Sequence, residues 1–164
     1  MYSAGFCGCD AARFTPMNSD VCAGFGKDGL RARSLVRMWP DLRFIQIRAT
    51  RNTTDCWISP FDMETVAEWR TVQYLTISAL RIPVPPSWAG LTSLRSLELR
   101  QFGVRELPGA VVGQWTALER LTITMSPQLQ EVPAKLWDLP ALSEVRMYGA
   151  GACDRVPEEW KEAC

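Results

Sequence analysis

Several features that catalysis or membrane insertion requires are missing from this sequence. Its 164 residues include no histidine, which excludes Ser-His-Asp and Cys-His nucleophile systems and every zinc site with a histidine ligand. No apolar run approaches the ~20 residues that a membrane-spanning helix needs. The 18 basic and 18 acidic side chains cancel, so the cationic excess typical of nucleic-acid-binding proteins is absent. We therefore expect no nucleic-acid partner and no membrane span.

The sequence also has no glycine-rich phosphate loop of the Walker type. The stretch from Gly24 to Gly29 is similar to a phosphate-binding turn, but no predicted strand precedes it, so we interpret it as an ordinary loop. What is present, 47% hydrophobic and 22% charged residues, is typical of one folded domain, and a chain of this length buries about 70% of its unfolded surface. We expect no cofactor and no bound metal.

The six cysteines lie near the two ends of the chain. They are Cys7, Cys9, Cys22, Cys56, Cys153 and Cys164. An even number so placed predicts disulfides formed in an oxidising compartment. We expect a Cys153–Cys164 bridge, and two bridges among the other four, one of which joins Cys56 to the first segment. Reduced thiols, or zinc bound by Cys7, Cys9 and Cys22, are alternatives, although the C-x-C-x12-C spacing lacks paired C-x2-C knuckles.

Asn52 begins the tripeptide Asn52-Thr53-Thr54, which matches the acceptor pattern for N-linked glycans. Together with the cysteines, this pattern favours a secreted, extracellular or lumenal glycoprotein. The first residues, MYSAGFCGCD, have neither the basic nor the apolar region of a signal peptide. A secreted form would therefore have lost its signal, or the sequence begins inside a longer chain.

Five segments of the chain share the pattern apolar-x-x-apolar-x-apolar. They are LRFIQI (42–47), VQYLTI (72–77), LRSLEL (94–99), LERLTI (118–123) and LSEVRM (142–147). Their fourth residues are Ile45, Leu75, Leu97, Leu121 and Val145, separated by 30, 22, 24 and 24 positions. Alternation with a period of two predicts strands, and a fixed period of 20–29 residues is typical of stacked repeats.

Between the strands, a proline recurs shortly before an apolar residue, as in Pro85-Pro86-Ser87-Trp88 and Val132-Pro133-Ala134-Lys135-Leu136. The fixed φ of proline suits the start of a short helical or extended segment. Tryptophans recur in phase with the strands, since Trp39, Trp69 and Trp115 each lie six positions before the fourth residue of one. This regularity predicts buried structural rings; an exposed aromatic platform that stacks on sugars or bases is the alternative.

On these five copies, the stretch from Trp39 to Trp160 resembles the leucine-rich-repeat family, and its texture is similar to the irregular repeats of plant and protist receptors. The resemblance implies an α/β solenoid, a right-handed superhelix with one parallel sheet on its concave face and short helical, 3-10 or extended segments on its convex face. At the position where the family places its asparagine ladder, the chain has Thr50, Leu80, Phe102, Ser126 and Ala150. We therefore expect an irregular, loosely curved stack.

A stack of repeats must have its two open ends covered, because each repeat buries its apolar face only against its neighbours. We expect one continuous domain with a cysteine-rich N-terminal cap at 1–38, five repeats at 39–151 and a disulfide-bonded C-terminal cap at 152–164. The inward strand positions should form the core. They are Ile45, Ile47, Leu75, Ile77, Leu97, Leu99, Leu121, Ile123, Val145 and Met147.

The outward strand positions are the candidate partner-binding surface, because they combine arginine and tyrosine, which are enriched at hot spots. The residues that we expect to contact a partner are Phe44, Arg48, Tyr74, Thr76, Glu98, Arg100, Arg120, Thr122, Arg146 and Tyr148. The alternative is a solvated sheet face in which Glu98 pairs with Arg120, and Glu144 pairs with Arg146 or Arg120.

The sequence thus predicts a non-catalytic protein–protein interaction module that presents a rigid concave surface for extracellular recognition or adhesion. One alternative is a structural subunit of an oligomer or fibre that self-associates through its convex face or caps. A further alternative is a hydrolase that uses the carboxylates from Asp62 to Glu68, where Glu64 and Glu68 would share one face of a short helix. A solvated helix face accounts for these carboxylates more simply.

Overall fold

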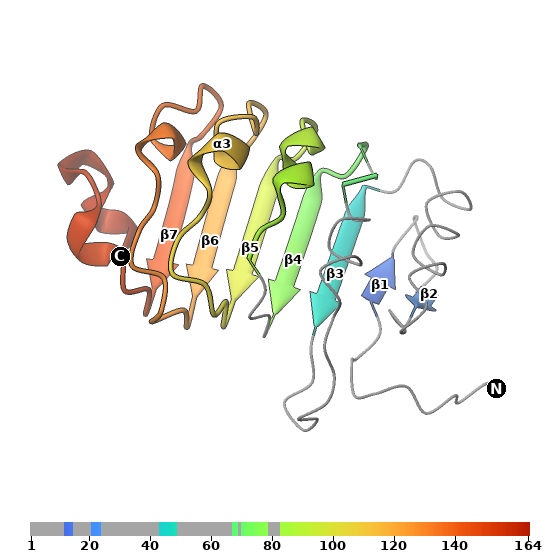
Figure 1. Ribbon diagram of the computed structural model, residues 1–164, viewed down its shortest axis with the longest axis horizontal. Coiled ribbons are helices and arrows are strands. Elements are labelled where there is room, and N and C mark those ends of the chain that lie inside the picture. Colours follow the sequence, from blue (N-terminus) through green and yellow to red (C-terminus); the bar gives the residue numbers. More distant parts are fainter. Residues whose placement is uncertain (1–11, 15–20, 24–42, 49–66, 69, 79–82) are drawn as a thin grey trace.

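A single β-sheet runs through the described part of the molecule. The computed structural model describes residues 12–14, 21–23, 43–48, 67–68, 70–78 and 83–164, and it gives the backbone alone at 12–14, 21–23 and 45–48. The strand order is β2-β1-β3-β4-β5-β6-β7, so from β3 onwards strands that follow one another along the chain also lie side by side (Figure 1).

The repeated segments form the parallel part of this sheet. Its strands are β3 (Phe44–Arg48), β4 (Tyr74–Ser78), β5 (Ser96–Arg100), β6 (Arg120–Thr124) and β7 (Glu144–Tyr148). Each pairs with the next over five residues, and the register aligns Ile45, Leu75, Leu97, Leu121 and Val145. These are the fourth residues of the five segments, so the predicted strands and their alignment are confirmed.

Two short strands that the sequence pattern does not indicate extend the sheet beyond β3. Strand β1 (Ala12–Phe14) pairs antiparallel with both β2 (Val21–Ala23) and β3. The expected parallel sheet therefore begins at β3, and an antiparallel pair that was not expected extends it at this end. A hairpin can pair with an edge strand in either direction, and its three-residue strands are too short for an alternating pattern to be recognised.

Short helical segments connect the parallel strands and lie next to one another. They are η1 (Pro86–Gly90), α3 (Gly109–Val112) and η2 (Ala134–Leu136). Pro85, Pro108 and Pro133 directly precede them, with φ of −72°, −70° and −65°. These angles lie where the pyrrolidine ring holds proline, which confirms the predicted role of proline in starting each segment.

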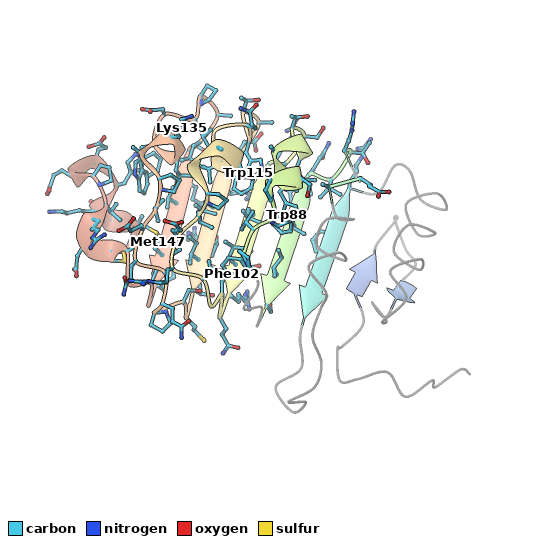
Figure 2. The ribbon with its side chains drawn as sticks, in the orientation of Figure 1. Trp88, Phe102, Trp115, Lys135 and Met147 are labelled. Carbon is cyan, nitrogen blue, oxygen red and sulfur yellow. A yellow bond between two sulfur atoms is a disulfide. The ribbon has the colours of Figure 1, made fainter. Side chains whose placement is uncertain are left out.

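The hydrophobic core lies between the sheet and the connecting segments. All eight predicted inward residues of β4–β7 are buried, with exposed fractions of 6% or less. Trp88 and Trp115, whose positions appear in Figure 2, are fully buried, and the Trp115 indole nitrogen donates a hydrogen bond to the Trp88 carbonyl oxygen at 2.9 Å. These two rings are structural, as predicted; Trp39 and Trp69 lie outside the described residues.

A serine links consecutive turns at one of the positions where the sequence lacks the asparagine of the ladder. Ser126 is fully buried, and its hydroxyl accepts a hydrogen bond from the Phe102 amide at 3.0 Å and donates one to the Thr124 carbonyl at 3.1 Å. The parallel strands pair residue for residue without a bulge. The register of these strands is therefore regular, and at this turn one hydroxyl satisfies the amide that the ladder would have served.

The last segment of the chain packs beside β7. It contains η3 (Cys153–Arg155) and η4 (Glu158–Ala163), and a disulfide joins Cys153 to Cys164 with their Cα atoms 5.8 Å apart. This pairing confirms the predicted C-terminal bridge. Cys7, Cys9 and Cys56 lie outside the described residues, as does Asn52, and the side chain of Cys22 lies outside them too.

Candidate functional site

The strand positions opposite the core form a face that the connecting segments leave open. We call it the open face and define it by three rows of described residues. The first row is Phe44, Tyr74, Ser96, Arg120 and Glu144; the second is Thr76, Glu98, Thr122 and Arg146; the third is Ser78, Arg100, Thr124 and Tyr148. Because the strands pair residue for residue, each row crosses the sheet at ~4.8 Å per strand.

An ion pair fixes the position of Glu98 in the second row. The Glu98 carboxylate accepts a hydrogen bond from Arg100 Nε at 2.6 Å on one oxygen, and one from the Thr76 hydroxyl at 3.3 Å on the other. Its partner is thus Arg100 on its own strand, so the alternative pairing with Arg120 is wrong. The Arg100 side chain is 54% exposed, and pairs of this kind contribute only ~0–1 kcal/mol to stability. The pair therefore orients the two side chains more than it stabilises the fold.

Arg146 pairs with Glu144 in the same manner, two residues away on β7. This is one of the pairings predicted for a solvated face. A further ion pair joins Arg95 Nη1 and Glu119 Oε1 at 3.2 Å. These two residues directly precede the first residues of β5 and β6. Most charges on and beside the open face are therefore already neutralised by a neighbour.

Among the open-face residues whose side chains the structure describes, Arg120 is the arginine outside this pairing. It is exposed in the first row, between Ser96 and Glu144 in register. Within the described part of the chain its guanidinium takes part in no ion pair or hydrogen bond, since Glu144 is bonded to Arg146 instead. A guanidinium presents five donors in a fixed plane, so Arg120 keeps its full capacity to bind an acceptor.

Aromatic side chains stand at both ends of the open face. Phe44 and Tyr74 are neighbours in the first row, with ring centroids 6.5 Å apart and planes tilted by 34°. Tyr148, at the end of the third row, is 54% exposed. Exposed aromatic rings of this kind bury large areas against a partner at small entropic cost.

The threonines of the open face are less accessible than the sequence suggested. Thr76 is only 9% exposed, and Thr122 is half-buried. Thr76 lies on the open face as expected, but with little exposed surface, and its hydroxyl donates a hydrogen bond to Glu98. The side chain of Arg48 lies outside the description, whereas Phe44, Tyr74, Glu98, Arg100, Arg120, Arg146 and Tyr148 all lie on the open face as expected.

The strand ends add a residue that the sequence analysis missed. Met125 follows β6, is 66% exposed and has a φ of +52°, and its amide donates to the Tyr148 carbonyl oxygen at 2.8 Å. Gln101 and Gly149 occupy the equivalent positions after β5 and β7, with φ of +51° and +65°. Of the three, only Gly149 is the residue type that commonly adopts a positive φ, so the sequence did not predict the turns at Gln101 and Met125.

The segments that follow β5 and β6 line a cavity of about 270 Å³. Its lining is Arg105, Glu106, Gln130 and Glu131. Arg105 donates a hydrogen bond to the Gln130 side chain at 3.1 Å, and Glu131 accepts one from Arg155 at 2.7 Å. Three of the four lining side chains are thus already bonded, so the cavity offers a ligand less than the open face does.

Other candidates from the sequence fall largely outside what the structure describes. Asp62, Glu64, Cys9 and the loop from Gly24 to Gly29 are not among the described residues. Within the described ranges, no group of three His, Cys, Asp or Glu side chains is arranged to hold a metal ion. The described helices are also too short to cross a membrane.

Comparison with known proteins adds no assignment to this geometry. No family model matches the chain, and no curated protein is significantly similar to it.

Proposed function

We propose that the chain is a leucine-rich-repeat solenoid that acts as a non-catalytic protein-interaction module. The parallel strands, their repeat spacing and the row of connecting segments support a right-handed superhelix with the open face on its concave side. The segments 1–38 and 152–164 would then cap the two ends of the stack.

One observation carries the functional proposal: the open face presents aromatic and charged side chains in fixed rows, and the inward side chains of β4–β7 behind it are buried. Leu97, Leu99, Leu121 and Ile123 anchor the two central strands of β4–β7 in the core with exposed fractions of 1% or less. Side chains held on such a scaffold lose little conformational entropy on association, which favours affinity. A surface of this kind serves recognition or adhesion.

The compartment that we propose is extracellular or lumenal. The disulfide between Cys153 and Cys164 supports it weakly, because disulfides persist mainly in oxidising compartments. An N-linked glycan on Asn52 and two disulfides among the remaining cysteines belong to the same proposal. Intact mass before and after reduction tests it: six free thiols in the protein purified from its source would contradict the compartment.

The interaction proposal is tested by partner capture with variants of the open face. Wild-type protein, Tyr74→Ala and Tyr148→Ala are compared with Lys135→Gln, whose side chain is exposed in η2 on the connecting side (Figure 2). We expect the open-face variants to lose a partner that wild type and Lys135→Gln retain. Partners that are retained by all variants would contradict the proposal, and sedimentation showing self-association of all four proteins would favour a structural subunit.

A further inference from the structure

The charges of the open face do not balance. Among the side chains that the structure describes there, Arg100, Arg120 and Arg146 stand against Glu98 and Glu144, an excess of one positive charge, and Arg48 adds a further arginine at the third-row position of β3. Two of the arginines have a carboxylate partner on their own strand, and Arg120 has none within the described residues. Among these described side chains, the excess charge therefore resides on Arg120 in the first row.

The neighbouring carboxylates are already occupied. Both oxygens of Glu98 accept hydrogen bonds, one from Arg100 and the other from Thr76. Glu144 lies beside Arg120 in register and lowers the local potential, but one of its oxygens is bonded to Arg146. A carboxylate supplied from outside would thus complete the set of pairs on the face.

An apolar contact lies in the same row as Arg120. Tyr74, which packs against Phe44, is aligned with Ser96 and then Arg120. The short Ser96 side chain separates the aromatic pair from the guanidinium, and two strand spacings place Tyr74 and Arg120 roughly 10 Å apart. The first row therefore combines an aromatic surface with an unpaired cation.

We propose that the open face binds an acidic peptide segment of a protein partner, with a carboxylate of the segment on Arg120 and an apolar side chain against Tyr74. The inference rests on the proposed function and names the chemistry of its partner. Arginine binds a carboxylate through two parallel N–H···O bonds, which gives direction as well as attraction.

The test is a titration of the full-length, isotopically labelled protein, followed by amide chemical shifts, with a peptide that contains Leu-Pro-Pro-Glu. In a polyproline II segment, side chains three residues apart lie on the same side at roughly 9 Å, which matches the spacing of Tyr74 and Arg120. The control peptides replace Glu by Gln or by Lys. We expect shifts in β4–β6 with the acidic peptide and much weaker binding of the controls.

Protein variants show whether Arg120 itself, or only the net charge of the protein, determines the affinity for the acidic peptide. We expect Arg120→Gln to raise the dissociation constant of the acidic peptide about tenfold. Lys135→Gln removes the same charge on the connecting side and should leave the constant unchanged within about twofold, which is the effect of a distant, screened charge. Glu98→Gln should release Arg100 for the ligand and tighten binding about threefold, the direction expected of a removed like charge.

Each remaining outcome decides between the two proposals. Binding of the Gln or Lys peptide that depends on Tyr74 but not on Arg120 would overturn the acidic preference and leave the interaction module standing. Binding that no variant of the open face affects would overturn both. A twelve-nucleotide single strand of DNA that binds more tightly than the acidic peptide, through Arg120, would overturn the peptide assignment in favour of a phosphate ligand.

Discussion

Replacement of Ser126 by alanine is the sharpest test of how consecutive turns are held together. The Ser126 hydroxyl is fully buried, 3.0 Å from the Phe102 amide nitrogen and 3.1 Å from the Thr124 carbonyl oxygen. Alanine fills the site without a clash but leaves a buried amide without an acceptor. An unsatisfied buried donor costs about 1–3 kcal/mol, so we expect Ser126→Ala to lower the free energy of unfolding by about 2 kcal/mol.

Urea denaturation followed by circular dichroism measures this change as a shift of the midpoint at constant slope. In a chain of this size, about 2 kcal/mol corresponds to a fall in melting temperature of roughly 4–8 °C. The matched control is Ser143→Ala, because Ser143 is exposed and also donates to a backbone carbonyl, that of Glu119 at 3.2 Å. Water replaces that bond, so the control should lose less than about 0.5 kcal/mol. Equal effects at the two serines would refute the reasoning.

Three further changes test other parts of the structure by thermal unfolding. Gly151→Ala should be destabilising, by about 1–3 kcal/mol, because its Cβ would lie 2.5 Å from the Pro127 carbonyl oxygen; a wild-type melting temperature would disprove that packing. Met125→Gly should stabilise by up to about 1 kcal/mol, since its φ of +52° suits glycine; a lower melting temperature would count against it. The double change Cys153→Ser and Cys164→Ser should cost about 3 kcal/mol for a loop of this length, and an unchanged transition would show that the bridge adds no stability.

The repeated strands were predictable because their buried positions are apolar and their exposed positions are polar. Leu97, Leu121 and Val145 alternate with polar neighbours, and a register shift of one residue would move such a set to the outer side of the sheet. The prolines before the connecting segments were predictable for a similar reason, since their fixed φ limits them to a few local structures. The apolar alternation and the prolines are both local features, so they do not depend on which residues a side chain contacts in the folded protein.

The site was less predictable because its details depend on choices among near-equivalent partners. Glu98 has arginines both on its own strand and on the next one, and residue spacing alone does not decide between them, whereas the structure pairs Glu98 with Arg100. The role of Ser126 was not predicted because the leucine-rich-repeat pattern has asparagine at this position. The buried Phe102 amide requires only a hydrogen-bond acceptor, which a serine hydroxyl also supplies. The burial of Thr76 follows from the packing of its neighbours, which an isolated strand pattern does not contain.

The constant offset between the last three strands has a genetic consequence. Leu97, Leu121 and Val145 are equivalent positions that lie 24 residues apart, and each unit touches only the units on either side. A tandem duplication of 72 nucleotides in this region would therefore encode one further strand and its connecting segment, with the same spacing as the existing ones. The sheet can lengthen by such events while every existing strand keeps an equivalent neighbour.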